Sequence, residues 1–190
     1  MASGEQPTVL VVDDEERIVN LYARQLERIA TVKKAFGGEE ALEKVDGTVD
    51  VILLDRRMPD VPGDEVLENL TEKGYESLVI IVTAVEPDFD IVDMPFDDYL
   101  VKPVTGDDLR ETVISVLERA SFRETARDYF AKASKQAALA GYKHPAQLES
   151  NEEYQRIQRE LDELRDRADA AIEELGPDAV KQLFQDLESD

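Results

Sequence analysis

Cysteine and tryptophan are absent from the 190 residues, and histidine occurs once. The lack of cysteine excludes disulfides, thiolate zinc sites and cysteine nucleophiles. A histidine-rich metal site within one chain is excluded as well. The single His144 stands before Pro145 in an expected loop, so we expect it at the surface.

Long apolar runs are also missing. The longest, Leu78–Val82, is far shorter than the roughly 20 residues that a membrane-spanning helix needs. The first residues, MASGEQPTV, show neither the basic nor the apolar region of a signal peptide. We therefore expect a soluble, cytoplasmic protein with no membrane partner.

Basic residues are few, 22 against 44 acidic ones, so the formal net charge is −22. One explanation is simply a well-solvated acidic surface. We favour adaptation to a salt-rich cytoplasm, where the screening length falls to roughly 3 Å at 1 M salt and weakens self-repulsion. Under either explanation, strong attraction to a nucleic-acid backbone or to anionic lipid is disfavoured.

The first part of the chain alternates short apolar runs with helical patterns. Most of the runs are nearly continuous Val, Ile and Leu, as expected for parallel strands that helices cover on both faces. The expected strands are Thr8–Val12, Val32–Phe36, Val51–Leu54, Leu78–Val82 and Tyr99–Val101. The expected helices are Glu16–Ile29, Glu39–Val45, Asp64–Lys73 and Asp107–Phe122. The alternation predicts an α/β domain with a doubly wound, five-stranded parallel sheet.

The segment between the fourth and fifth expected strands has no helical period. Its sequence, AVEPDFDIVDMPF, contains Pro87, Pro95 and four acidic residues. Proline breaks helix interiors and disfavours helix in the residue before it. The sequence therefore predicts a shortened or absent fourth helix.

From residue 122 the pattern is helical. Phe122–Ala140 is alanine-rich, Gly141–Leu148 forms an expected break, and Ser150 with Glu153 predicts a capping box for a last helix. Gly176-Pro177 is expected to end that helix. Along it, a heptad seam consists of Tyr154, Ile157, Leu161, Leu164, Ala168, Ala171 and Leu175. We predict an α/β domain over residues 1–120 and an all-α helical hairpin or coiled-coil unit over residues 121–190.

Acidic residues crowd the ends of two expected strands, with Asp13 and Asp14 after the first and Asp55 after the third. If the strand order is 2-1-3-4-5, these two strands are neighbours, and the chain winds in opposite directions from them. Ligands of open α/β sheets bind at the carboxyl ends of the strands at this point. Three close carboxylates raise each other's pKa unless a cation intervenes, and Mg²⁺ suits oxygen ligands of this kind. Thr83 and Lys102 end the fourth and fifth strands. The set is chemically suited to forming an aspartyl phosphate.

Residues of about 7 to 120 resemble the receiver domain of two-component response regulators. The resemblance rests on an ordered set of residues, most of them at or just after the carboxyl end of an expected strand. The set is Asp13, Asp14, Asp55, Met58, Pro59, Gly63, Thr83, Ala84, Tyr99, Lys102 and Pro103. The resemblance implies a flavodoxin-like sheet of order 2-1-3-4-5.

The resemblance also implies roles. Asp55 would accept the phosphoryl group, and Asp14 with Asp55 would hold Mg²⁺ directly while Asp13 acts through water. The backbone carbonyl of Arg57 would complete the protein ligands of the metal. Arg57 is an unusual neighbour of the acceptor, and we hypothesise that it alters the lifetime of the phosphoryl group.

In the same resemblance, Lys102 would pair with the phosphoryl group, and the Lys102–Pro103 bond would be cis. Thr83 and Tyr99 would form the switch pair: Thr83 moves to a phosphoryl oxygen and Tyr99 turns inward after it. Each residue alone also has a structural explanation, such as helix capping, packing or an exposed loop position. Their joint placement at matching strand ends favours function.

The C-terminal part resembles the HalX module that follows receivers in salt-loving archaea. The heptad helix could pair with a twin in a homodimer, with another protein, or with the Phe122–Ala140 helix of its own chain. An alternative is a DNA-binding transcriptional regulator acting through the basic stretch 119–143. Its basic residues are Arg119, Arg123, Arg127, Lys132, Lys135 and Lys143. We favour a solvated helix face, because high salt weakens phosphate contacts.

The sequence thus predicts a response regulator that takes a phosphoryl group from a histidine kinase onto Asp55 with Mg²⁺. Such a protein is a switch and not a turnover enzyme, since its chemistry is limited to its own phosphorylation and dephosphorylation. The rival is a stand-alone Mg²⁺-dependent phosphatase of α/β type. It is disfavoured because such enzymes usually carry a second acid two residues after the nucleophile, where this chain has Arg57.

Overall fold

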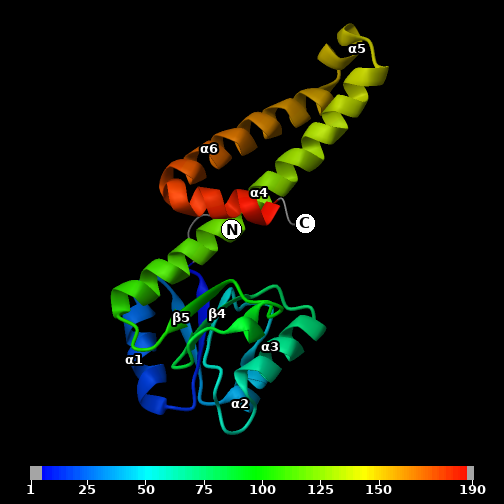
Figure 1. Cartoon of the computed structure of the whole chain (residues 1–190). Coiled ribbons are helices and arrows are strands. Elements are labelled where there is room, and N and C mark those ends of the chain that lie inside the picture. Colours follow the sequence, from blue (N-terminus) through cyan, green and yellow to red (C-terminus); the bar gives the residue numbers. More distant parts are fainter. Residues whose placement is uncertain (1–5, 188–190) are drawn as a thin grey trace. The chain divides into compact units, whose positions relative to one another are not determined.

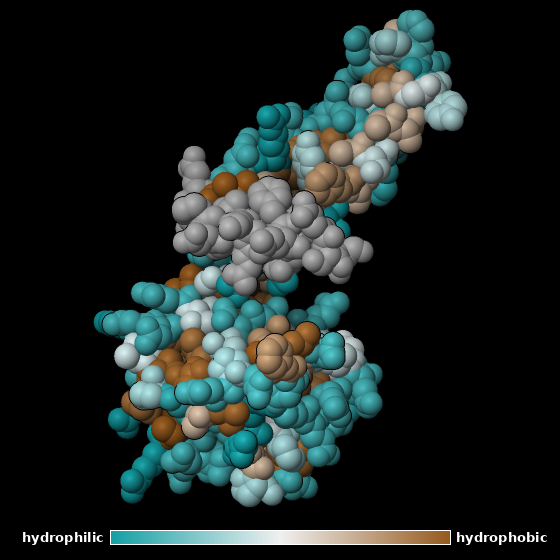
Figure 2. All heavy atoms as spheres, in the orientation of Figure 1, coloured by the Kyte–Doolittle hydropathy of each residue, from teal (hydrophilic) through white to brown (hydrophobic). Residues whose placement is uncertain are grey.

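A computed structural model describes residues 6–187, with side chains as far as residue 172. The chain divides after Leu117 into two compact units, which are described separately. No helix of the described residues is long and apolar enough to cross a bilayer. Among the coloured residues of Figure 2, hydrophilic ones dominate the face that is shown, in keeping with the high charge of the chain.

The first unit is built on a five-stranded sheet with the order β2-β1-β3-β4-β5, and every neighbouring pair is parallel. The strands are β1 (Thr8–Val12), β2 (Thr31–Ala35), β3 (Val51–Leu54), β4 (Leu78–Thr83) and β5 (Asp98–Val101). All of β3 and nearly all of β1 and β4 are buried. Continuous apolar runs form these central strands because helices cover both sides of the sheet. The predicted doubly wound fold is confirmed.

Helices cover the two faces of the sheet (Figure 1). They are α1 (Glu16–Leu26), α2 (Gly38–Lys44), α3 (Gly63–Glu72) and the first turns of α4 (Gly106–Tyr142). On one face, buried residues of α1 and α4 pack with alternate strand residues such as Val11, Leu53 and Ile80. On the other face, α2 and α3 pack with Leu10, Ile52 and Ile81. Side chains of one strand therefore alternate between two cores.

The fourth crossover contains one turn of 3-10 helix, η1 (Phe89–Ile91), in place of a full helix. The side chain of Asp88 caps this turn by accepting a hydrogen bond from the backbone N–H of Phe89 at 2.7 Å. Pro87 and Pro95 flank the segment and prevent it from extending in either direction. The prediction of a shortened fourth helix is confirmed.

Gly63 lets α3 begin directly against the end of β3. A Cβ atom at this position would lie 2.2 Å from the backbone oxygen of Asp55, which no side chain can tolerate. The N–H of Gly63 also donates to the carbonyl of Arg56 at 2.9 Å. The glycine therefore fixes the backbone that presents Asp55.

The second unit consists of the rest of α4, the short helix α5 (Pro145–Glu149) and α6 (Glu152–Leu187). Two expected helices, Asp107–Phe122 and Phe122–Ala140, are one continuous helix, because no proline or glycine interrupts the chain where they meet. The expected break at Gly141–Leu148 contains α5, which the side chain of His144 caps by accepting from the N–H of Ala146. His144 is exposed, as expected.

Two predictions about α6 are wrong. Asn151, and not Ser150, caps the helix by accepting from the N–H of Tyr154 at 2.9 Å. The hydroxyl of Ser150 instead donates to the carbonyl of Ala146 at 2.9 Å and belongs to α5. The helix also continues through Gly176-Pro177, and its ribbon changes direction before the red C-terminal part (Figure 1). A proline can bend a helix without ending it.

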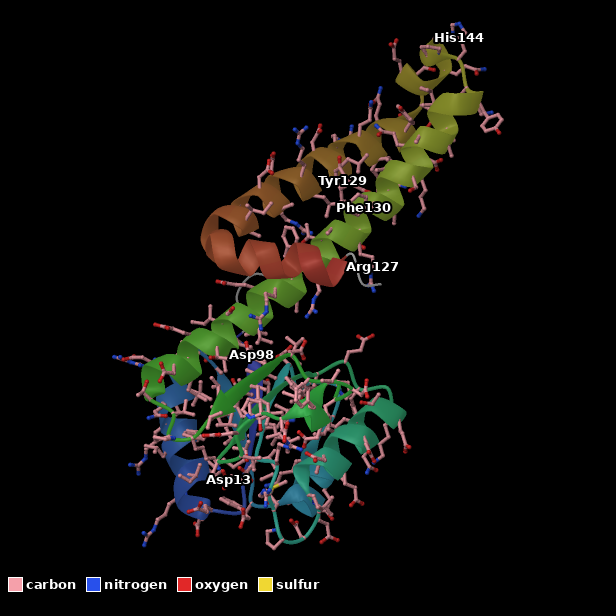
Figure 3. The ribbon with its side chains drawn as sticks, viewed as in Figure 1. Asp13, Asp98, Arg127, Tyr129, Phe130 and His144 are labelled. Atoms are coloured by element: carbon pink, nitrogen blue, oxygen red, sulfur yellow. The ribbon has the colours of Figure 1, made fainter. Side chains whose placement is uncertain are left out.

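The heptad seam of α6 is its least exposed side, with Leu161 and Leu164 buried; Leu175 lies outside the described side chains. The helix pairs with α4 of the same chain: Lys132 Nζ lies 2.6 Å from Glu160 Oε2, and Arg167 donates to the Thr125 hydroxyl at 3.4 Å. The sticks place Tyr129 of α4 beside α6 (Figure 3). The helical hairpin thus forms within one chain.

Candidate functional site

The carboxyl ends of β1, β3 and β5 bring distant residues together. Because β1 and β3 are hydrogen-bonded neighbours, Asp13 and Asp55 follow adjacent strands, with Val12 opposite Leu54 in the register. Asp13 lies at the loop that leads into α1 (Figure 3). Lys102 follows β5, and its N–H donates to the carbonyl of Thr83 at 2.8 Å. The next peptide bond, Lys102–Pro103, is cis.

The Lys102 ammonium bridges two carboxylates. Its Nζ lies 2.6 Å from Asp13 Oδ2 and 2.8 Å from Asp55 Oδ1. The two carboxylate side chains are 3% and 7% exposed and the lysine side chain 17%. One positive charge thus faces two negative charges in a place with little water, so the site retains a net negative charge.

Each carboxylate also accepts one backbone hydrogen bond. The N–H of Glu15 donates to Asp13 Oδ1 at 2.9 Å, and the N–H of Arg57 donates to Asp55 Oδ2 at 2.7 Å. Burial raises the pKa of Asp13 despite the hydrogen bond from Lys102. Burial alone would lower the pKa of Lys102, but its bonds with Asp13 and Asp55 outweigh this effect and raise it. Lys102 is therefore held as an ammonium ion.

Asp14 is set apart from this pair. It is exposed and lines a neighbouring pocket of about 620 Å³. The other lining residues are Arg56, Arg57, Met58, Pro59, Pro62, Asp64, Val85 and Asp90. Within residues 6–172 no three acidic side chains are gathered into a metal cluster. The structure therefore brings together two of the three predicted carboxylates.

A cluster of three acids is not required for Mg²⁺, which binds through one or two carboxylates and keeps several waters. Asp13 and Asp55 carry two negative charges against the one positive charge of Lys102, and a hard cation would neutralise the excess. Asp14 lies at the adjacent pocket and can supply a further oxygen. The donor set therefore fits this ion.

Thr83 and Tyr99 are linked through the backbone of one residue. Thr83 is buried, and its hydroxyl accepts from the N–H of Val85 at 3.4 Å. The Tyr99 hydroxyl donates to the carbonyl of Val85 at 2.8 Å. The Tyr99 ring is half-buried and packs against Phe96 at 5.7 Å between ring centroids. Thr83 and Tyr99 thus both bond to the backbone of Val85.

Sequence reasoning did not anticipate the contacts of Arg56. This side chain is 8% exposed, forks onto Asp64 with two hydrogen bonds of 2.9 Å, and reaches Asp90 at 2.7 Å. The sequence offers one signal for this residue, its position directly after Asp55. Its partner Asp90 could not be deduced, since it belongs to the irregular segment after β4.

Comparison with known proteins gives two family matches. Residues 9–114 match the response regulator receiver domain, and residues 118–184 match the HalX domain. A relative from Haloferax volcanii, named as a candidate transcriptional regulator, is 47% identical over 88% of this chain and 29% of its own length. The alkaline phosphatase synthesis transcriptional regulatory protein PhoP of Bacillus subtilis is 37% identical over 59% of this chain and 49% of its own length. The chain thus spans half or less of either relative.

Solved receiver structures match the first unit. The BeF3-activated receiver domain of DrrB has a TM-score of 0.55 and 28% identity, covering 60% of this chain and 98% of that domain. TrrA of Thermotoga maritima in complex with Mg(2+)-BeF has a TM-score of 0.51 and 32% identity, covering 58% of this chain and 99% of TrrA. These structures confirm the fold of the first unit, and the two family matches confirm the predicted resemblances to a receiver and to HalX.

Proposed function

The chain belongs to the response regulator receiver family and carries a HalX domain after its receiver, and from this we propose that it is a phosphorylation switch whose acceptor is Asp55. The observation that carries the proposal is the Lys102 bridge, 2.6 Å to Asp13 and 2.8 Å to Asp55. A buried carboxylate beside a fixed ammonium is positioned to attack a phosphorus atom and to have the incoming charge neutralised.

The donor is a histidine kinase. An oxygen of Asp55 attacks the phosphorus of a phosphohistidine, an O–P bond forms, and the N–P bond breaks with its electron pair returning to the imidazole. The Lys102 ammonium, which contacts Asp55 before the reaction, then pairs with a phosphoryl oxygen on Asp55. The backbone N–H of Arg57, now on Asp55 Oδ2 at 2.7 Å, orients the carboxylate for this attack.

Asp13, Asp14, Asp55 and the backbone carbonyl of Arg57 would hold Mg²⁺, which neutralises charge on the transferring phosphoryl oxygens. Asp14 is exposed at the pocket and can turn toward the ion without leaving a buried position. Asp13 is fixed by Lys102 and by the N–H of Glu15, which supports the assignment of Asp13 to a contact through water.

Thr83 and Tyr99 form the switch. When the Thr83 hydroxyl turns to a phosphoryl oxygen, it leaves the N–H of Val85, a long bond of 3.4 Å that is lost at low cost. Tyr99 holds the carbonyl of the same residue at 2.8 Å and follows its movement. The chemistry ends on the protein itself, so we assign a switch and not a turnover enzyme. Arg57 in place of a second acid argues against the α/β phosphatase rival.

We assign the HalX domain to interaction with a protein partner or a second copy of the chain. The DNA-binding alternative, through residues 119–143, draws support from relatives named transcriptional regulators. The ion pair of Lys132 with Glu160 at 2.6 Å argues against it, because one of the basic residues in that stretch is already neutralised. Analytical ultracentrifugation at several concentrations tests the dimer: a strict monomer in both phosphorylation states eliminates it.

Intact-mass spectrometry after incubation with acetyl phosphate and Mg²⁺ tests the phosphoacceptor. The wild type should gain the mass of one phosphoryl group and Asp55→Asn should gain none. Asp50→Asn, which alters an acid at the opposite end of β3, is the matched control and should be phosphorylated as the wild type is. An unmodified wild type, or equal labelling of Asp55→Asn, would refute the assignment.

A further inference from the structure

Arg56, in the loop directly after the phosphoacceptor, contacts two elements, α3 and η1. Its guanidinium donates through Nε and Nη2 to the two oxygens of Asp64 in α3, and through Nη2 also to Asp90 in η1. The bidentate contact fixes the plane of the guanidinium, since two parallel bonds define its orientation. Arg56 is thus held in a fixed orientation by α3, and it binds the segment after β4 through Asp90.

Few apolar side chains of η1 and its flank are buried. Phe89 and Val92 are 89% and 73% exposed, and Ile91 is half-buried. Packing against the core resumes at Met94 and Phe96. Between Val85 and Met94, the ion pair of Asp90 with Arg56 therefore carries much of the attachment of the segment to the sheet.

The attachment lies close to the switch residues. Tyr99 contributes to the raised pKa of Arg56, after the larger contributions of Asp64 and Asp90. Arg56 and the switch residue Tyr99 therefore lie close enough to interact.

We propose that Arg56 is a positioning residue that ties segment 88–94 to the phosphorylation site through Asp90 and opposes switching in the unphosphorylated protein. The inference rests on the proposed function, since it concerns the response to phosphorylation at Asp55. The loop from Val85 to Asp90 is held at one end by Thr83 and Tyr99 and at the other by Arg56. Because Tyr99 holds the carbonyl of Val85, a displacement of Val85 together with Tyr99 would strain the contact of Arg56 with Asp90 at the other end of this loop.

Thermodynamic linkage couples this contact to ligand binding. A contact that is stronger in the unswitched state lowers the affinity for any ligand that selects the switched state, and removing the contact raises that affinity. Asp90 is 56% exposed, so Asp90→Asn leaves no buried charge on the segment and should not unfold the domain. We expect about a fivefold tighter apparent affinity for a phosphoryl mimic in Asp90→Asn.

The test titrates beryllofluoride at saturating Mg²⁺ into the full-length protein by calorimetry. Asp90→Asn should bind more tightly than the wild type, and Asp90→Glu, whose carboxylate can still reach Arg56, should return toward the wild-type value. Asp93→Asn, an exposed acid in the same segment, removes an equal charge and should not change the affinity. Thermal unfolding of each variant separates a loss of stability from a change in coupling.

Equal or weaker binding by Asp90→Asn, with a wild type that binds, would overturn the role of Arg56 and leave the proposed function intact. An equal gain in Asp93→Asn would also overturn it, because the effect would then come from charge alone. A wild type that binds no beryllofluoride while folded would overturn the proposed function and this inference together.

Discussion

Replacing Lys102 with methionine should reveal how strongly the acidic pair repels itself. Lys102→Met retains a side chain of similar length and removes the ammonium that lies 2.6 Å from Asp13 and 2.8 Å from Asp55. Both carboxylate side chains are at most 7% exposed, so water can solvate them only in part once the ammonium is gone. The variant therefore leaves two uncompensated buried carboxylates side by side.

Breaking a buried ion pair by removing one partner usually costs about 3–5 kcal/mol. We expect about 3 kcal/mol here, because Asp13 can release its charge by protonation, and this corresponds to a fall in the unfolding temperature of roughly 10 °C. The loss should shrink as pH falls. Burial already raises the pKa of Asp13 above its unfolded value, and without Lys102 the folded protein gains stability when this carboxyl takes up a proton.

Thermal unfolding followed by circular dichroism, with and without Mg²⁺, measures both effects. Mg²⁺ should restore more stability to Lys102→Met than it adds to the wild type, because the ion replaces the missing positive charge. Lys73→Met, an exposed lysine at the end of α3, is the control and should unfold like the wild type. If Lys102→Met lost no more stability than Lys73→Met, or gained nothing extra from Mg²⁺, the picture of a crowded acidic pair would be wrong.

Three further predictions follow from single contacts. Arg57→Ala should change the dephosphorylation rate of Asp55, and an unchanged decay in a time course after removal of the phosphodonor would contradict this. Lys132 lowers the pKa of Glu160, so Glu160→Gln should lower the unfolding temperature at neutral pH. The difference from the wild type should vanish as pH falls through the lowered pKa, and a difference that persists in acid would contradict the ion pair. Gly63→Ala should cost about 2 kcal/mol in chemical denaturation, because a Cβ would lie 2.2 Å from a backbone oxygen, and wild-type stability would show that the backbone there yields easily.

Local patterns in the sequence predicted most elements of the first unit. β1 and β3 begin and end where the apolar runs do, and η1 appears where Pro87 and Pro95 forbid a helix. Errors arose where the local signal is ambiguous. Ser150 and Asn151 are both good capping residues and are adjacent, so only the path of the chain decides between them. Gly176-Pro177 bends a helix in one context and ends it in another.

The sequence by itself determined which residues stand at the ends of the strands, because strand periodicity and turn chemistry act over a few residues. Only the tertiary structure decided which of them touch. Lys102 meets Asp13 across 89 residues and Asp55 across 47, and Arg56 meets Asp90 across 34. Asp14, a neighbour of Asp13 in sequence, remains exposed. Such pairings depend on how strands order in the sheet and on where an irregular loop settles, and no local pattern encodes either.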